Sequence, residues 1–281
     1  MNRNGRPVDF AVTVSEEKLG DAAPVLFQGG IVPAIDAAAR VGYDAVELHV
    51  RDPLTLDAAA IRSAARDAGV RIAAIGTGLE YSKNGLSMTS DDPSVLARMH
   101  DRFREHIEFA AEFAPDPTVV FVGLCRGVAP SYALCDEYLR RFHAALVPLV
   151  EFATEAGVTL VLEPVAYYFS NLLNTTAESI EFLKLPGLNP VELLLDTHHM
   201  FLEDPDLADA FRLAKGIVSY IHFSDSNRRS PGAGNIDFLA AAEAIAEIGY
   251  HGTVSIEVLP FPDGPTAAKY SIAELRRVFG Q

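Results

Sequence analysis

TLVLEPV, at residues 159–165, is the first of four apolar runs that each end in an acid or a histidine. The other three are VELLLDTHH (191–199), VSYIHFSD (218–225) and TVSIEVLP (253–260). Runs of Val, Ile and Leu are typical of parallel strands, which are buried on both faces. A carboxylate or imidazole that ends such a strand is costly to bury unless another group pairs with it. The side chains at these ends are Glu163, Asp196, His222 and Glu257.

The same strand pattern recurs in the first half of the chain, at residues 10–14, 44–50, 71–77 and 118–124. Each of the eight runs is followed by a segment with apolar residues at helical spacing. These segments are 31–42, 56–69, 92–113, 131–157, 176–185, 206–214, 235–249 and 266–280. Eight strand–helix units predict an α/β protein with a (β/α)8 TIM-barrel fold, in a single domain over residues 1–281. A doubly wound open sheet is the alternative, but the even number of units and the spread of polar strand ends favour the barrel.

The composition limits the possible functions. The chain has 281 residues, 49% of them hydrophobic, and a formal net charge of −15, which opposes binding to nucleic acid. Its two cysteines, Cys125 and Cys135, lack the spacing of a zinc site and fit a reducing compartment. The polar N-terminus does not look like a signal peptide, and no apolar run reaches membrane-spanning length. We therefore expect a cytoplasmic protein with no nucleic-acid or membrane partner.

The four polar strand ends predict a metal site. In a TIM barrel the C-terminal ends of the strands meet at one face, where active sites lie. Taken singly, Glu163 could be a structural acid paired with an arginine, and His222 an ordinary buried histidine. Together, the four side chains are better explained as ligands of one divalent metal ion. One nitrogen and three carboxylates suit Mn²⁺, with Co²⁺ or Mg²⁺ as alternatives.

Two of these carboxylates are candidate catalytic groups. A metal that polarises a carbonyl eases proton loss from the neighbouring carbon and stabilises the resulting enediolate. Glu163 and Glu257 close the fifth and eighth strands, so one could remove the proton and the other return one. Return to the opposite face of the carbon inverts it, and return to the neighbouring carbon moves the carbonyl. This predicts an isomerase or epimerase of a keto-sugar or keto-sugar acid.

Other polar residues near the strand ends are candidate substrate contacts. His199 could donate a hydrogen bond to a substrate oxygen, and Arg228 lies six residues after His222. Arg51 and Arg126 could each hold a carboxylate or phosphate, although salt bridges to loop acids would explain them equally well. Glu47 is a further acid at a strand end. Long segments at 15–30, 78–92 and 226–235 are expected as loops over the site.

The chain resembles the xylose-isomerase-like superfamily of sugar phosphate isomerases and epimerases. The resemblance is strongest in LEPV, LLDTHHM, IHFSDSNRRSPGAGNIDF and VSIEVLP. The strings AVELHVRDP, AAIGTGLEYSKNGLSMT, FVGLCRG and SDSNRRSPGAG are most similar to the branch that contains 5-keto-L-gluconate epimerase and D-tagatose 3-epimerase. The resemblance implies the four metal ligands already named, acid–base roles for Glu163 and Glu257, and substrate contacts at His199 and Arg228. It also implies a carbohydrate substrate and a homo-oligomer, either a dimer or a tetramer.

One segment departs from the pattern of these epimerases, which continue Glu-Pro-x-Asn-Arg-x-Glu after the fifth strand. Here Ala166, Tyr167 and Phe169 stand where the Asn, Arg and second Glu would be. We expect Tyr167 and Phe169 to form an aromatic wall that contacts the substrate. This predicts weak activity on free ketohexoses. It predicts better activity on a substrate with an apolar substituent, or with an anionic group near Arg51 or Arg126.

Three other functions fit parts of the pattern. A metal-dependent lyase or dehydratase of a keto-sugar or 3-keto-glycoside would share the first proton abstraction and then lose a β-substituent, as a C-glycoside deglycosidase does; this alternative stays open. An endonuclease of the same superfamily would need a histidine-rich site for three metals and a surface that binds a polyanion. A scaffold without enzymatic activity would leave the four aligned ligand residues unexplained.

Overall fold

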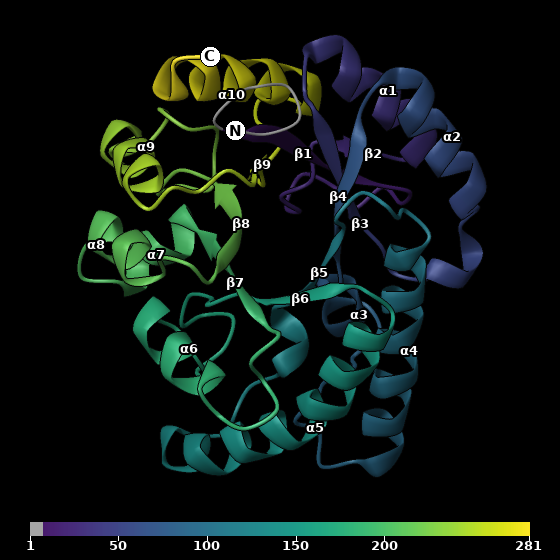
Figure 1. Ribbon diagram of the computed structural model, residues 1–281, viewed down its shortest axis with the longest axis vertical. Helices are drawn as coiled ribbons and strands as arrows, with labels where there is room; N and C mark the ends of the chain where they lie inside the picture. The colour runs from purple at the N-terminus through teal and green to yellow at the C-terminus, as the bar shows by residue number, and fades with distance from the viewer. Residues whose placement is uncertain (1–7) are drawn as a thin grey trace.

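The computed structural model describes residues 8–281, and its parallel strands close into a barrel (Figure 1). In order around the ring, the barrel strands are β1 (Asp9–Ser15), β3 (Ala45–His49), β4 (Arg71–Gly76), β5 (Val119–Val122), β6 (Thr159–Leu162), β7 (Glu192–Asp196), β8 (Val218–Phe223) and β9 (Thr253–Ile256). Pairing of β1 with β9 closes the ring. The predicted (β/α)8 fold is confirmed, and the open sheet is excluded. The single domain over residues 1–281 stays a prediction, because residues 1–7 lie outside the described part.

Helices surround the barrel (Figure 1) and lie close to the predicted segments. They are α1 (Ile31–Val41), α2 (Ala58–Ala68), α4 (Pro93–Ala111), α5 (Cys135–Glu155), α6 (Thr176–Leu183), α8 (Leu207–Leu213), α9 (Phe238–Glu247) and α10 (Gly264–Phe279). Local signals set their ends: the Asp57 side chain accepts the Ala60 N–H at the start of α2, and Gly69 ends it in the left-handed conformation. Across residues 8–281, every helix is too short or too polar to serve as a membrane span.

The sequence pattern missed several short elements, some of them within segments expected as loops. These are β2 (Phe27–Gln28), α3 (Gly78–Ser82) and α7 (Thr197–Glu203), with 3-10 turns at Pro53–Thr55, Leu124–Arg126 and Tyr132–Leu134. The helix α7 begins directly after β7 because Asp196 caps it, accepting the His198 N–H at 2.8 Å. The predicted loop at 226–235 contains no helix or strand.

The inside of the barrel is packed with small side chains on one side and large ones on the other. Ala11, Ala45 and Ala74 come from β1, β3 and β4, and face Phe121 and Tyr220 from β5 and β8. The two aromatic rings lie 5.3 Å apart between centroids. Both rings also contact the imidazole of His222, at 5.3 and 5.6 Å between centroids. The packed interior thus forms an apolar floor under the polar strand ends.

Candidate metal centre and active site

The structure brings Glu163, Asp196, His222 and Glu257 together at the C-terminal end of the barrel. One potential ligand atom from each lies within 4.8 Å of the others. The register of β7 and β8 places Asp196 opposite His222. The His222 Nδ1 atom lies 3.4–3.7 Å from oxygens of the three carboxylates, yet it is buried with no hydrogen-bond partner. A cation would satisfy this nitrogen and the surrounding oxygens, so the residues fit a divalent metal ion.

The four side chains lie at two depths. Asp196 and His222 are 0% and 1% exposed and lie on the barrel floor. Glu163 and Glu257 keep 12% and 11% of their side chains exposed and line a cavity of about 360 Å³. The two carboxylates predicted as the acid–base pair are therefore the two that face the space a substrate would enter.

Glu47 orients the histidine of the cluster. It is fully buried on β3, and its carboxylate accepts hydrogen bonds from His222 Nε2 at 2.9 Å and His49 Nε2 at 2.8 Å. Because Glu47 holds Nε2, the other ring nitrogen of His222 faces the carboxylate cluster. A carboxylate in this position fixes the ring orientation and raises the basicity of a metal-binding histidine. The sequence placed Glu47 at a strand end but gave no indication of its partners.

Burial and charge shift the pKa values in the cluster. Burial by itself would lower the pKa of His222, but the carboxylates around it, Glu47 foremost, raise it well above its usual range. Burial raises the pKa of Glu163. Burial would also raise the pKa of Asp196, yet the guanidinium of Arg228 holds it well below its usual range. The site is thus a concentration of negative charge that cations stabilise.

Arg228 is held against this cluster by its backbone. Its guanidinium donates to Asp196 Oδ2 at 2.5 Å and to Glu257 Oε2. Its φ of 61° is unusual for a residue with a side chain. Two hydrogen bonds fix this conformation: the Arg228 N–H donates to the Asp225 carbonyl, and the Leu259 N–H donates to the Arg228 carbonyl, both at 2.8 Å. The loop after β8 is therefore built to place this side chain, which also lines the cavity.

His199 and Phe169 form another wall of the cavity. His199 lies on α7 rather than in a loop, and its Nδ1 accepts the Ala166 N–H at 3.3 Å. Since Nδ1 is an acceptor and burial keeps the pKa of His199 well below its usual range, Nε2 carries the remaining proton. Nε2 lies 4.0 Å from Glu163 Oε1. The Phe169 ring meets the His199 ring edge-on, with centroids 5.7 Å apart.

The other predicted substrate contacts do not line this cavity. Arg51 lies close to Glu17, with Nε 2.5 Å from Oε1, and matches the salt-bridge alternative. Arg126 is fully buried and donates to the carbonyls of Gly123, Leu172 and Leu173. Tyr167 is 63% exposed outside the cavity. The geometry gives no support to an anionic substrate group at either arginine, and all three contacts stay predictions.

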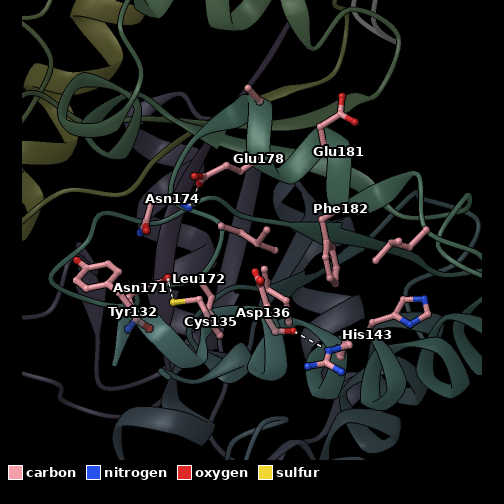
Figure 2. Close-up of a pocket in the computed structure, with 15 residues that line it drawn as sticks. Tyr132, Cys135, Asp136, His143, Asn171, Leu172, Asn174, Glu178, Glu181 and Phe182 are labelled. Carbon is pink, nitrogen blue, oxygen red and sulfur yellow. Dashed lines mark hydrogen bonds between the residues drawn. The ribbon is translucent and has the colours of Figure 1, made fainter. Parts of the chain in front are cut away.

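A larger hollow lies on the outside of the barrel, between α5 and α6 (Figure 2). Its volume is about 840 Å³, and its walls include Cys135, Phe182 and the acids Glu178 and Glu181. None of the four predicted metal ligands lines it. The smaller cavity is therefore the better candidate for the active site, because Glu163 and Glu257 line it.

Comparison with known proteins identifies the family. The sequence model of the family described as "Xylose isomerase-like TIM barrel" matches residues 35–278. The chain belongs to this family. It is 33% identical over 218 residues to L-ribulose 3-epimerase of Mesorhizobium japonicum, covering 78% of this chain and 72% of that one. It is 30% identical over 237 residues to D-psicose 3-epimerase of Agrobacterium fabrum, covering 80% and 78%.

A solved structure of L-ribulose 3-epimerase superposes with a TM-score of 0.80 at 27% identity, over 97% of this chain and 95% of that chain. Together these relatives confirm the predicted superfamily and the predicted class of enzyme, a sugar epimerase or isomerase.

Glu47→Gln is expected to weaken metal binding, because the amide no longer accepts a charge-assisted hydrogen bond from His222 Nε2. Loss of such a partner costs about 10- to 100-fold in metal affinity. Calorimetric titration of the chelator-treated protein with Mn²⁺ measures the change. The matched control is Asp204→Asn, which removes a carboxylate bonded to Thr176 at the C-terminal end of α7, the end opposite Asp196. An unchanged affinity in Glu47→Gln would show that Glu47 does not act through His222.

Gly123→Ala is expected to lower turnover while leaving the fold intact. A Cβ atom at Gly123 would lie 2.6 Å from Glu163 Oε2, so the carboxylate must move. Movement of a flexible side chain costs little stability, but misplacing a catalytic group by about 1 Å can cost about 100-fold in rate. Gly69→Ala is the control with the opposite expectation. The φ of 72° at this position strains an alanine backbone, although the space around its Cβ is open. It should lower the melting temperature and leave kcat unchanged. A Gly123→Ala enzyme with normal kcat would contradict the placement of Glu163.

Proposed function

We propose that this enzyme epimerises a keto-sugar at the carbon next to its carbonyl, with Glu163 and Glu257 as the acid–base pair and Mn²⁺ as the bound metal. The observation that carries this proposal is the pair of carboxylates that face the cavity on either side of His222. The named relatives are 3-epimerases of ketoses, whose carbonyl is at C2, which supports reaction at C3.

The two glutamates reach the cavity from different directions. Glu163 follows β6 and Glu257 follows β9, and β7 and β8 lie between these strands in the barrel. One carboxylate can therefore remove a proton from one face of a carbon while the other delivers a proton to the opposite face, which inverts the centre. A bound divalent cation would lower the barrier by polarising the carbonyl beside that carbon.

Two further residues are suited to hold the substrate. His199 presents Nε2–H to the cavity, because the Ala166 N–H occupies its other ring nitrogen, so it can donate to a substrate oxygen. The Arg228 guanidinium lies at the same wall as Glu257 and can offset negative charge that develops on the sugar. Apolar side chains, including Leu79, Leu124 and Phe169, complete the walls and limit the access of water.

Metal removal is expected to destabilise the protein. Binding to the folded state alone stabilises it by about 2.7 kcal/mol at a free metal concentration 100 times Kd, which corresponds to several degrees in melting temperature. Thermal unfolding of chelator-treated protein, with and without added Mn²⁺, measures this shift. Asp196→Ala should abolish most of it, whereas Glu112→Ala, an exposed acid at the end of α4, should not. If Mn²⁺, Co²⁺ and Mg²⁺ all leave the melting temperature unchanged, the prediction of a metal site is wrong.

Proton exchange with solvent is expected at the epimerised carbon. In D₂O, the product formed from D-psicose, L-ribulose or a keto-glycoside should carry deuterium at that position, because each turnover returns a proton from a carboxylate. NMR of the product measures the label. Glu163→Gln and Glu257→Gln should each lower kcat by about 100-fold or more.

An unlabelled product would point to a hydride shift between carbons and would refute the two-base mechanism. Release of the aglycone from a keto-glycoside, with no epimer formed, would instead establish the lyase alternative. Better turnover of free ketohexoses than of substituted substrates would show that Phe169 does not restrict the substrate as expected.

A further inference from the structure

A second hollow, of about 460 Å³, adjoins the metal cavity. Its walls are Tyr81, Val128, Tyr132, Tyr167, Tyr168, Phe169, Ser170 and Asn171. Phe169 lines both spaces, and α3 contributes Tyr81 to this hollow and Leu79 to the cavity. Tyr132 and Asn171, labelled in Figure 2, line both this space and the larger hollow between α5 and α6. A molecule that extends out of the metal cavity past Phe169 would therefore enter this space, which we call the aromatic hollow.

The aromatic hollow exposes an unusual amount of ring surface. The exposed fractions of Tyr132, Tyr167, Tyr168 and Phe169 are 75%, 63%, 51% and 40%. Successive rings contact one another, with centroids 5.6 Å apart for Tyr167 and Tyr168 and 4.6 Å apart for Tyr168 and Phe169. An exposed cluster of large apolar side chains at the edge of a cavity is typical of a binding surface.

Hydrogen bonds hold the central ring in place. The Tyr168 hydroxyl lies 2.7 Å from His198 Nε2, and His198 Nδ1 lies 3.1 Å from the Asp225 carbonyl oxygen. Since a carbonyl only accepts, Nδ1 of His198 donates to it and Nε2 accepts from Tyr168. Tyr168 is thus fixed, through His198, to Asp225, which lies two residues after the end of β8. A fixed ring loses little entropy when a ligand stacks on it.

The aromatic hollow has little to offer a charged ligand. Within the described residues 8–281, no Lys, Arg, Asp or Glu is among its walls. The Asn171 side chain is occupied on both sides by the backbone of Ala129, at 2.9 and 3.0 Å, and the Ser170 hydroxyl donates to the Gly127 carbonyl at 2.8 Å. What remains available is mainly ring faces. These bind flat, uncharged groups with an apolar face.

We propose that the aromatic hollow is a subsite for an uncharged ring joined to the sugar in the metal cavity, so that the substrate is a glycoside rather than a free ketose. The ring can be an aryl group or the apolar face of a second sugar, since both present a flat surface to Tyr132 and Tyr167. The proposal rests on the proposed function for the position of the reacting sugar. The subsite itself rests on Phe169, which connects the two spaces.

Calorimetric titration of the full-length, Mn²⁺-loaded protein with three unreactive probes tests the proposal: methyl β-D-glucopyranoside, phenyl β-D-glucopyranoside and cellobiose. We expect the phenyl glycoside or cellobiose to bind about three- to tenfold more tightly than the methyl glycoside, the range set by one aromatic contact. Tyr132→Ala and Tyr167→Ala should each reduce this ratio. Tyr270→Ala, a tyrosine of comparable exposure on α10, is the matched control and should preserve it.

Equal affinity for the three probes, or no measurable binding of any of them, overturns the proposal. So does a ratio that survives both Tyr132→Ala and Tyr167→Ala. The probes have no ketone, so the result does not depend on turnover. Phenyl glycoside binding that requires Tyr132, in a protein that exchanges no deuterium into any keto-sugar, would leave the subsite standing and refute the proposed function. Deuterium exchange without tighter binding of either the phenyl glycoside or cellobiose would support the proposed function and refute the subsite.

Discussion

Three carboxylates that converge on one buried imidazole set the main constraint on this structure. Like charges at this separation repel strongly in a poorly solvated site, so the cluster requires positive charge around it. The Arg228 guanidinium and a divalent cation are the available sources, because a His222 that binds the cation is neutral. The closed barrel forces the strand ends together, and the left-handed backbone at Arg228 brings in the guanidinium. The loop after β8 thus supplies positive charge to the carboxylates at the ends of β7 and β9.

Arg228 and a metal ion would act on the same oxygens. The guanidinium contacts Asp196 Oδ2 and Glu257 Oε2, which are also the oxygens of these residues nearest to His222 Nδ1. A carboxylate oxygen has more than one lone pair, so it can accept from an arginine and bind a cation together. Glu163 has no arginine partner of this kind among residues 8–281. This difference separates the two glutamates: Glu257 is paired with the Arg228 guanidinium, whereas burial raises the pKa of Glu163.

The cluster of three acids and one histidine and the barrel could both be predicted from the sequence, because both follow from local patterns. A polar residue at the end of an apolar strand is costly to bury, and four such ends already indicated a site. The hydrogen bond of Glu47 with His222 could not be predicted, because it joins residues 175 positions apart and depends on barrel closure. The position of the proton on His199 could not be predicted either, because it depends on the backbone N–H of Ala166 in a different segment of the chain. The carbonyl partners of Arg126 could not be predicted either, because a guanidinium bound to backbone carbonyls has no signature in the sequence.

The residues that perform chemistry and those that would select the substrate lie on different parts of the fold. The four clustered residues proposed as metal ligands and proton carriers occupy strand ends, where the packed barrel holds them. The aromatic wall occupies one segment after β6, and its rings are exposed and contribute little to the core. Surface side chains of this kind can change at a cost of a few tenths of a kcal/mol. The contact between Phe169 and His199 is the point where the two parts meet. A change of substrate therefore requires few changes elsewhere, provided that this contact keeps the His199 ring in place.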